Sequence, residues 1–235
     1  MNRLPGYMAG RTGVFVAIAI AIAAALGFFL QRHFTRPALV PSPAATVTAA
    51  VSAAPAETLQ PKVPDVLPQF VLADKDGKPR KLGEWSGRPL AVNYWATWCA
   101  PCRREIPLLN KLRRERSGQK LEIIGIAVDF RDDVLKYAAE TTIDYPLLIG
   151  EEDGLEAVKA MGMQAAFPFT VFADSRQRIV ALKIGELHQD EADLILDRIA
   201  DIDSGKLQLS VAREQITEGL KTLATKRSAA DAAAA

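Results

Sequence analysis

The two cysteines of this 235-residue chain lie three positions apart, in the segment WATWCAPC at residues 95–102. The run 89–95 before them is mostly apolar without strict alternation, which is typical of a strand buried on both faces. The residues from about Cys99 to Arg116 predict a helix with a basic outer face. Cys99 is therefore expected at the amino end of that helix, where unpaired N–H groups and the helix dipole favour a thiolate.

This spacing favours a redox-active dithiol in which Cys99 attacks a disulfide and Cys102 resolves the mixed disulfide. A zinc site is one alternative, but the only other candidate ligands of its usual kind are His33 and His188, which are far apart in sequence. Inert core cysteines are the second alternative, and they do not explain a proline, Pro101, in a loop at a strand-to-helix junction. We expect no metal and no cofactor.

The amino-terminal third predicts an anchor and a tether. Residues 14–30 carry no charge, and with their neighbours they predict a transmembrane anchor at 12–31 after a cytoplasmic stub at 1–11. A cleaved signal peptide has a shorter apolar region and a buried helix has a polar face, so both alternatives fit less well. The Ala- and Pro-rich segment 32–62 is expected to be a linker.

Residues 63–205 are predicted to form the folded domain. They hold 24 acidic and 19 basic residues, whereas the whole chain has a net charge of +1, which excludes a strongly basic nucleic-acid binder. Alternating strand and helix patterns predict an α/β sheet that is mostly parallel with an antiparallel edge. The expected strands are 70–72, 80–82, 89–95, 121–128, 146–149, 169–173 and 179–184, and the expected helices are 99–116, 132–140, 154–161 and 190–202.

Residues 206–235 are expected to add one more helix and a tail. Apolar positions recur at helical spacing over 211–226 and predict that helix. The alanine-rich end that follows it is expected to fray.

WATWCAPC and the flanking VNYW resemble the TlpA/ResA/CcmG-like group of membrane-anchored bacterial thioredoxin-like proteins, over about residues 63–203. Pro107 matches the proline that kinks the active-site helix of thioredoxins, and Phe167-Pro168-Phe169-Thr170 matches the X-Pro-X-Thr element of the family. The resemblance implies a thioredoxin fold with an N-terminal β-hairpin and a helix-containing central insertion between residues 128 and 146, preceded by one transmembrane helix. It also implies a cis Phe167–Pro168 bond, with Pro168 facing the cysteines.

Other residues gain candidate roles from the same resemblance. Glu105 follows Cys102 by three positions on the same helix face, and the family implies that it tunes the pKa of the cysteines and relays protons. The alternative is a solvated helix glutamate among arginines. Asn93 replaces a buried acid of plain thioredoxin, which leaves Glu105 as the candidate proton carrier. Trp98 is expected to shield Cys99 and to bind substrate together with Phe167 and Pro168.

The resemblance also implies a location and partners. It implies a thiol–disulfide oxidoreductase in the bacterial inner membrane, with a single span and a periplasmic domain. By the same resemblance, the protein is expected to reduce protein disulfides, such as those of apocytochrome c or copper-site proteins, and to be reduced itself by a transmembrane thiol electron donor. We expect no nucleic-acid partner. The alternatives are a disulfide-forming oxidase of the same fold and a non-enzymatic tethered metallochaperone or docking module.

His188 is expected at the end of the sheet away from the cysteines.

Overall fold

The computed structural model describes residues 63–234. The predicted stub (1–11), anchor (12–31) and linker (32–62) lie outside the described residues. Between residues 63 and 234, no helix is both long enough and apolar enough to cross a membrane.

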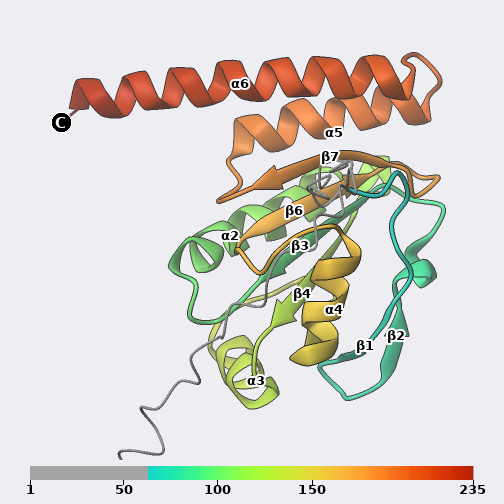
Figure 1. The fold of residues 1–235 in the computed structure, drawn as a ribbon, viewed down its shortest axis with the longest axis vertical. Coiled ribbons are helices and arrows are strands. Elements are labelled where there is room, and N and C mark those ends of the chain that lie inside the picture. Colours follow the sequence, from blue (N-terminus) through green and yellow to red (C-terminus); the bar gives the residue numbers. More distant parts are fainter. Residues whose placement is uncertain (1–62, 235) are drawn as a thin grey trace, which may run out of the picture. The chain divides into compact units, whose positions relative to one another are not determined.

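Seven strands form one sheet within the described residues, and helices follow most of them along the chain (Figure 1). The strands are β1 (Val71–Asp74), β2 (Pro79–Lys81), β3 (Leu90–Trp95), β4 (Glu122–Val128), β5 (Leu147–Gly150), β6 (Phe169–Ala173) and β7 (Ile179–Ile184). The α-helices are α2 (Ala100–Glu115), α3 (Arg131–Glu140), α4 (Glu152–Ala160), α5 (Gln189–Asp203) and α6 (Leu209–Ala234). Two short 3₁₀ turns, η1 (Leu82–Trp85) and η2 (Ser117–Gln119), complete the set. Each strand and helix predicted between residues 63 and 226 has its counterpart.

The strand order is β2-β1-β5-β4-β3-β6-β7, and it corrects one prediction. Only the central pairs β3–β4 and β4–β5 are parallel, while β1 pairs antiparallel with β2 and β5, and β6 with β3 and β7. The expectation of a mostly parallel sheet was therefore wrong. A buried strand is apolar whichever way its neighbours run, so the sequence pattern does not report the direction of β6.

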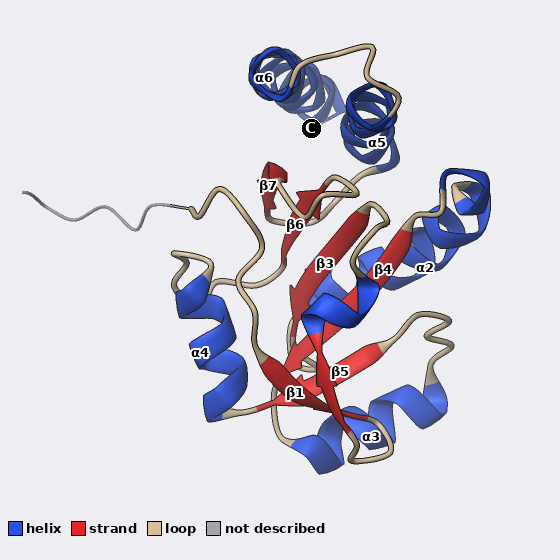
Figure 2. Ribbon diagram, turned by 90° about the vertical axis from the view of Figure 1, so that its right-hand side faces the viewer, coloured by secondary structure: helices blue, strands red, loops and turns tan. Residues whose placement is uncertain are grey.

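Helices cover both faces of the sheet (Figure 2). On one face, side chains of α4 such as Val158 pack with Val92 and Ile124 of the central strands. On the other face, α2 and α5 pack against odd-numbered positions of β3 and β4, for example Ala91 and Ile123. Because side chains alternate along a strand, Asn93 shares this second face with Ala91 and points toward α2.

The direction of β7 corrects the expected place of His188. Ile184, at the end of β7, pairs with Phe169, and Phe169 pairs with Tyr94 near the carboxyl end of β3. The segment after β7, including His188 at the amino end of α5, therefore leaves the sheet at the same end as the cysteines.

The carboxyl-terminal segment also differs from the prediction. Helix α6 continues to Ala234, through the alanine-rich stretch that was expected to fray. Alanine has the highest intrinsic helix propensity, so a run of alanines extends a helix that tertiary packing has already formed. Ala212 and Ile216 of α6 are buried against α5 in the second core cluster.

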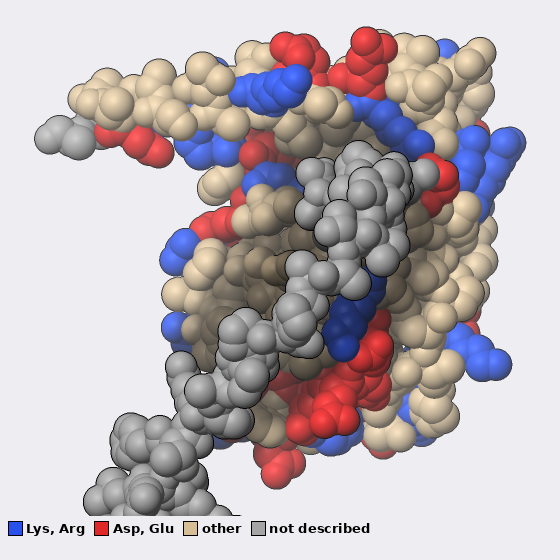
Figure 3. Space-filling model, in the orientation of Figure 1, with Lys and Arg blue, Asp and Glu red and all other residues tan. Residues whose placement is uncertain are grey.

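Acidic side chains gather on one part of the surface (Figure 3). They lie over the amino end of α4 and over the neighbouring β1–β2 turn. Glu151 directly precedes α4, and Glu152 and Asp153 lie in its first turn. On the face shown, these carboxylates form a local acidic patch at the start of α4.

Candidate active site

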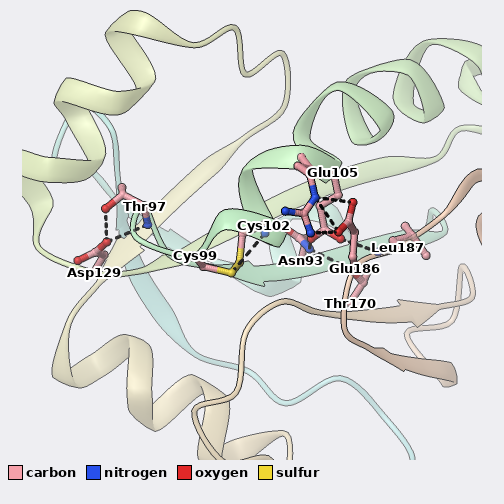
Figure 4. The surroundings of a disulfide bond; sticks show 10 residues. Asn93, Thr97, Cys99, Cys102, Glu105, Asp129, Thr170, Glu186 and Leu187 are labelled. Carbon is pink, nitrogen blue, oxygen red and sulfur yellow. Dashed lines mark hydrogen bonds and ion pairs between the residues drawn. A yellow bond between two sulfur atoms is a disulfide. The ribbon is translucent and has the colours of Figure 1, made fainter. Parts of the chain in front are cut away.

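Cys99 and Cys102 are joined by a disulfide at the junction of β3 and α2 (Figure 4). Cys99 caps the amino end of α2, and its sulfur accepts a hydrogen bond from the Cys102 N–H at 3.3 Å. Cys99 is 5% exposed and Cys102 is fully buried. In the reduced protein the same N–H and the helix dipole would stabilise a thiolate at Cys99, which is the more accessible sulfur. The assignment of Cys99 as the attacking and Cys102 as the resolving cysteine stays a prediction, with which this geometry is compatible.

Helix α2 carries its functional side chains on a buried face. Pro107 lies inside the helix, as predicted, and cannot donate a backbone hydrogen bond to the preceding turn. Cys102, Glu105, Ile106 and Leu109 are all buried on the side that faces the sheet. Glu105 therefore points inward with its apolar neighbours, and the alternative of a solvated glutamate among arginines was wrong.

Glu105 is 1% exposed and accepts two hydrogen bonds. The amide Nδ2 of Asn93 donates to Oε1 at 2.7 Å, and the backbone N–H of Leu187 donates to Oε2 at 2.7 Å. Asn93 Nδ2 also donates to Thr170 Oγ1 at 3.0 Å, which fixes the orientation of the amide (Figure 4). Each carboxyl oxygen thus has one donor, supplied from β3 and from the segment between β7 and α5.

Burial raises the pKa of Glu105 to about 7, although the hydrogen bonds from Leu187 and Asn93 oppose this rise. The nearby Glu186 carboxylate raises the same pKa further, and the ammonium of Lys183 lowers it. A carboxyl that titrates near neutral pH can both accept and donate a proton during a reaction. The sequence placed Glu105 near the cysteines, and the structure adds the burial that makes proton exchange possible at pH 7.

A second polar contact, between Thr97 and Asp129, fixes the loop before Cys99. The backbone N–H and the hydroxyl of Thr97 donate to Asp129 Oδ2 at 2.9 and 2.5 Å. Sequence analysis missed Asp129, although one signal was available. Asp129 directly follows the predicted strand β4, and the carboxyl ends of parallel neighbours meet at the same edge of a sheet. No comparable signal pointed to Leu187, which acts through its backbone.

The Phe167–Pro168 peptide bond is cis, as the resemblance implied. Phe167 packs against the cluster that holds both cysteines, and its ring lies 6.1 Å from that of Trp98. The Trp98 side chain is 68% exposed, so most of it faces solvent. The Pro168 carbonyl accepts a hydrogen bond from the Gly185 N–H at 2.9 Å. That Pro168 faces the cysteines stays a prediction.

An apolar groove of about 360 Å³ lies beside the disulfide loop. Three of the large apolar side chains that the described domain leaves exposed line it, namely Trp98, Phe130 and Leu155. Phe167, Val128 and Ala165 complete the apolar lining, and Asp129, Glu151 and Glu152 supply carboxylates. Exposed apolar side chains that gather at one groove are typical of a binding surface.

The described residues offer no metal site. Between residues 63 and 234, no three side chains of His, Cys, Asp or Glu form a group that could hold a metal ion.

Comparisons with known proteins agree with this geometry. The model of the Redoxin family matches residues 62–196. The thiol-disulfide oxidoreductase ResA of Geobacillus thermodenitrificans is 29% identical over 133 residues, which are 56% of this chain and 75% of that protein.

Solved structures with the same fold point in the same direction. A thioredoxin-family thiol:disulfide interchange protein from Chlorobium tepidum TLS is 27% identical, with a TM-score of 0.50 over 60% of this chain and 96% of that one. The thioredoxin domain of a thiol-disulfide oxidoreductase from Bacteroides vulgatus shares the fold, at 20% identity and a TM-score of 0.52 over 59% of this chain and 98% of that one.

The fold, the disulfide at the amino end of α2 and the relatives agree on the chemistry, which is thiol–disulfide exchange. The family model spans more than half of the chain, including every strand of the described residues and the cysteine pair. This chain is a thiol–disulfide oxidoreductase and belongs to the Redoxin family, in its TlpA/ResA/CcmG-like thioredoxin-fold group.

Proposed function

We propose that this protein is a membrane-tethered periplasmic reductant of protein disulfides. The observation that carries the proposal is the Cys99–Cys102 pair at the amino end of α2, with the buried carboxyl of Glu105 on the same helix face. The apolar segment 12–31 and the Ala- and Pro-rich segment 32–62 support the tether.

The reduced protein starts the reaction with the Cys99 thiolate. It attacks one sulfur of the substrate disulfide, so that the substrate S–S bond breaks and a mixed disulfide forms with Cys99. The released substrate sulfur takes up a proton. Cys102 then loses its proton and attacks the Cys99 sulfur, which breaks the mixed disulfide and releases the second substrate thiolate. The substrate gains two electrons, and the protein is left in the oxidised form.

Glu105 is proposed to carry the proton in the second half of this reaction. Cys102 is fully buried, so its proton needs an acceptor within the protein before it can attack. The Glu105 carboxyl, whose pKa burial raises to about 7, can take that proton and pass it to the departing substrate sulfur. A carboxylate near the sulfurs also makes a second negative charge there costly, which favours proton transfer over a stable second thiolate.

The groove lined by Trp98, Phe130 and Phe167 is proposed to hold the substrate polypeptide beside Cys99. A substrate polypeptide in an extended conformation presents apolar side chains on either side of its cysteine. A groove with exposed aromatic rings can bury those side chains. Pro168, which directly precedes β6, is proposed to border the same surface.

The Ala100-Pro101 dipeptide between the cysteines favours the reducing direction, since it resembles reducing members of the group more than oxidising ones. Equilibration of the Cys99–Cys102 pair with glutathione tests the direction. A reductant should give a potential well below about −180 mV, and a value at or above it would establish the disulfide-forming oxidase instead.

The proposed substrates are apocytochrome c, whose haem-attachment cysteines must be reduced, or copper-site proteins of respiratory oxidases. Re-reduction of the protein needs an electron donor, for which we propose a transmembrane thiol carrier. Deletion of the gene tests the first substrate. Loss of c-type cytochromes with rescue by an added external thiol would support it, and normal cytochromes would shift the proposal to copper-site proteins.

A reporter fused after residue 235 tests the location. Activity of a periplasm-dependent reporter is expected, because the domain follows the anchor. A signal from a cytoplasm-dependent reporter would contradict the periplasmic assignment.

A further inference from the structure

The loop between β7 and α5, residues 185–188, contacts two parts of the active site through its backbone. The Gly185 N–H donates to the carbonyl of Pro168 at 2.9 Å, and the Leu187 N–H donates to Oε2 of Glu105 at 2.7 Å. Leu187 itself is buried. The position of this loop therefore decides whether Glu105 keeps one of its two hydrogen bonds.

The loop is held in turn by Glu191, which is 3% exposed in the first turn of α5. Its Oε2 accepts a hydrogen bond from the His188 N–H at 3.1 Å and lies 3.4 Å from Nζ of Lys183. Lys183 also donates to the carbonyls of Ile184 and Glu186, at 3.0 Å each. Glu191 and Lys183 thus fix the residues on both sides of Leu187.

A second cation reaches Glu191 from the carboxyl-terminal helix. Nη1 of Arg227 donates to Oε1 of Glu191 at 3.0 Å, and Nη2 donates to Oδ1 of Asp190 at 2.9 Å. A buried carboxylate is costly unless it is paired and hydrogen-bonded, and here two cations share that role. Arg227 lies beyond residue 196, where the match to the family model ends, so the likeness to the family does not account for it.

We propose that Arg227 of α6 is a positioning residue for the redox site, because it holds Glu191 and through it the 185–188 loop against Glu105. Helix α6 then contributes more than packing on α5. Through Glu191 and the loop, this helix sets the strength of the hydrogen bond from the Leu187 N–H to the Glu105 carboxyl. That hydrogen bond in turn affects the pH at which Glu105 exchanges its proton. The inference rests on the proposed role of Glu105 and is independent of the direction of electron flow.

Several charged groups face Glu105 and bear on its titration. Lys183 at the end of β7 lowers its pKa and Glu186 in the following loop raises it, and the Glu105 carboxylate in turn raises the pKa of Tyr145, in the segment before β5. Arg104, on α2 itself, is paired with Glu186. Glu186 lies in the 185–188 loop and Lys183 pairs with Glu191, so both can move with the loop when Arg227 is changed. The titration of Glu105 is therefore read together with hydrogen exchange at Leu187, which reports the loop directly.

The test uses the full chain in mild detergent with three variants. Arg227→Gln removes the contact with Glu191, and Arg227→Lys keeps the charge. Arg213→Gln is the matched control, because Arg213 also ties α6 to the domain but does so at the start of β7, through the carbonyl of Ile179. If Arg227→Gln does not fold, Glu191→Gln takes its place, since it weakens the same contact from the other side.

Two readouts separate positioning from general loosening of the fold. Amide hydrogen exchange at Leu187 should become about tenfold faster in Arg227→Gln, the order that one hydrogen bond contributes. The titration midpoint of Glu105, followed by its carboxyl carbon resonance, should rise by at least about half a pH unit, or about threefold in its ionisation constant, because the lost bond favoured the charged form. Arg227→Lys should restore most of both values.

Unchanged exchange at Leu187, a Glu105 midpoint that stays or falls, or equal effects from Arg213→Gln would overturn the proposal. Neither readout depends on turnover. A positive result together with normal activity of a Glu105→Gln variant would reject the proposed proton transfer by Glu105 while leaving the positioning by Arg227 intact.

Discussion

The two sides of the Cys99–Cys102 disulfide differ in burial, since one exposes large apolar side chains and the other buries a carboxyl group. On the groove side, Trp98 and Phe130 are 68% and 64% exposed, although large aromatic rings are normally buried. On the other side, the carboxyl of Glu105 is almost fully buried, although glutamates are normally exposed. Both departures cost folding free energy, and both are explained by the chemistry of the sulfurs between them. One side is suited to contact with a partner and the other to exchange of a proton.

The largest effect is expected at the sulfurs that both sides share. Cys99→Ser should lower the rate of disulfide reduction by at least about a thousandfold, because the attacking nucleophile is lost. Cys102→Ser should keep the first attack and accumulate a mixed disulfide, which mass spectrometry would detect. Adduct formation at Cys102 in the Cys99→Ser variant, at the rate of the unchanged protein, would reverse the assigned roles.

The polar side is tested by Glu105→Gln, which should lower the rate of substrate reduction at pH 7 by about a hundredfold. The rate should also lose its inflection near pH 7, since the group that titrates there is gone. Glu115→Gln is the matched control, because it removes an exposed carboxylate from the last turn of the same helix. An inflection near pH 7 that persists in Glu105→Gln would assign it to another group.

The same variant predicts a change in stability. Burial raises the pKa of Glu105 from 4.5 to about 7 on folding, so the folded state binds the proton more tightly than the unfolded chain. This contribution is fully present below about pH 4.5 and is lost as the pH rises through about 7. Urea unfolding across this range should show a smaller decline in the free energy of unfolding for Glu105→Gln than for the unchanged protein. Equal declines would mean that folding does not shift the pKa of Glu105.

The groove side is tested by Phe130→Ala, which should raise KM for a protein disulfide about tenfold and leave kcat nearly unchanged. A small disulfide, which does not fill the groove, should be reduced at the normal rate. Val211→Ala is a suitable control, because Val211 is an exposed apolar residue on α6 and does not line the groove. A normal KM in Phe130→Ala would place the substrate elsewhere.

The smallest effect is expected at the contact that orients the loop between the two sides. Thr97→Val removes the hydroxyl that donates to Asp129 but keeps the backbone N–H bond. Loss of one such hydrogen bond should lower kcat/KM about threefold. Thr142→Val is the comparison, since Thr142 lies in the segment before β5 and engages the fold through its backbone carbonyl. A drop as large as that of Glu105→Gln would make Asp129 and Thr97 more than a support for the loop.

Prediction from the sequence succeeded where the pattern is local. The apolar run 89–95 and the amphipathic helix after it fixed the strand–loop–helix unit, and with it the place of Cys99 at a helix end. It failed where the answer depends on contacts far apart in the chain. The direction of β6, and hence the side on which His188 emerges, is decided by pairing with β3 across about 75 intervening residues. Hydrophobic periodicity carries no information on that pairing.

Glu105 shows both what the local sequence pattern predicts and what only contacts between distant segments decide. Its spacing from Cys102 placed it on the right face of α2 from the sequence alone, because a helix repeats every 3.6 residues. Its burial and its two hydrogen-bond donors, Asn93 and Leu187, come from β3 and from the loop before α5. The sequence thus identified the groups that are proposed to carry the chemistry. Only the tertiary structure decided the proton affinity of Glu105, because that depends on how completely distant segments exclude water from it.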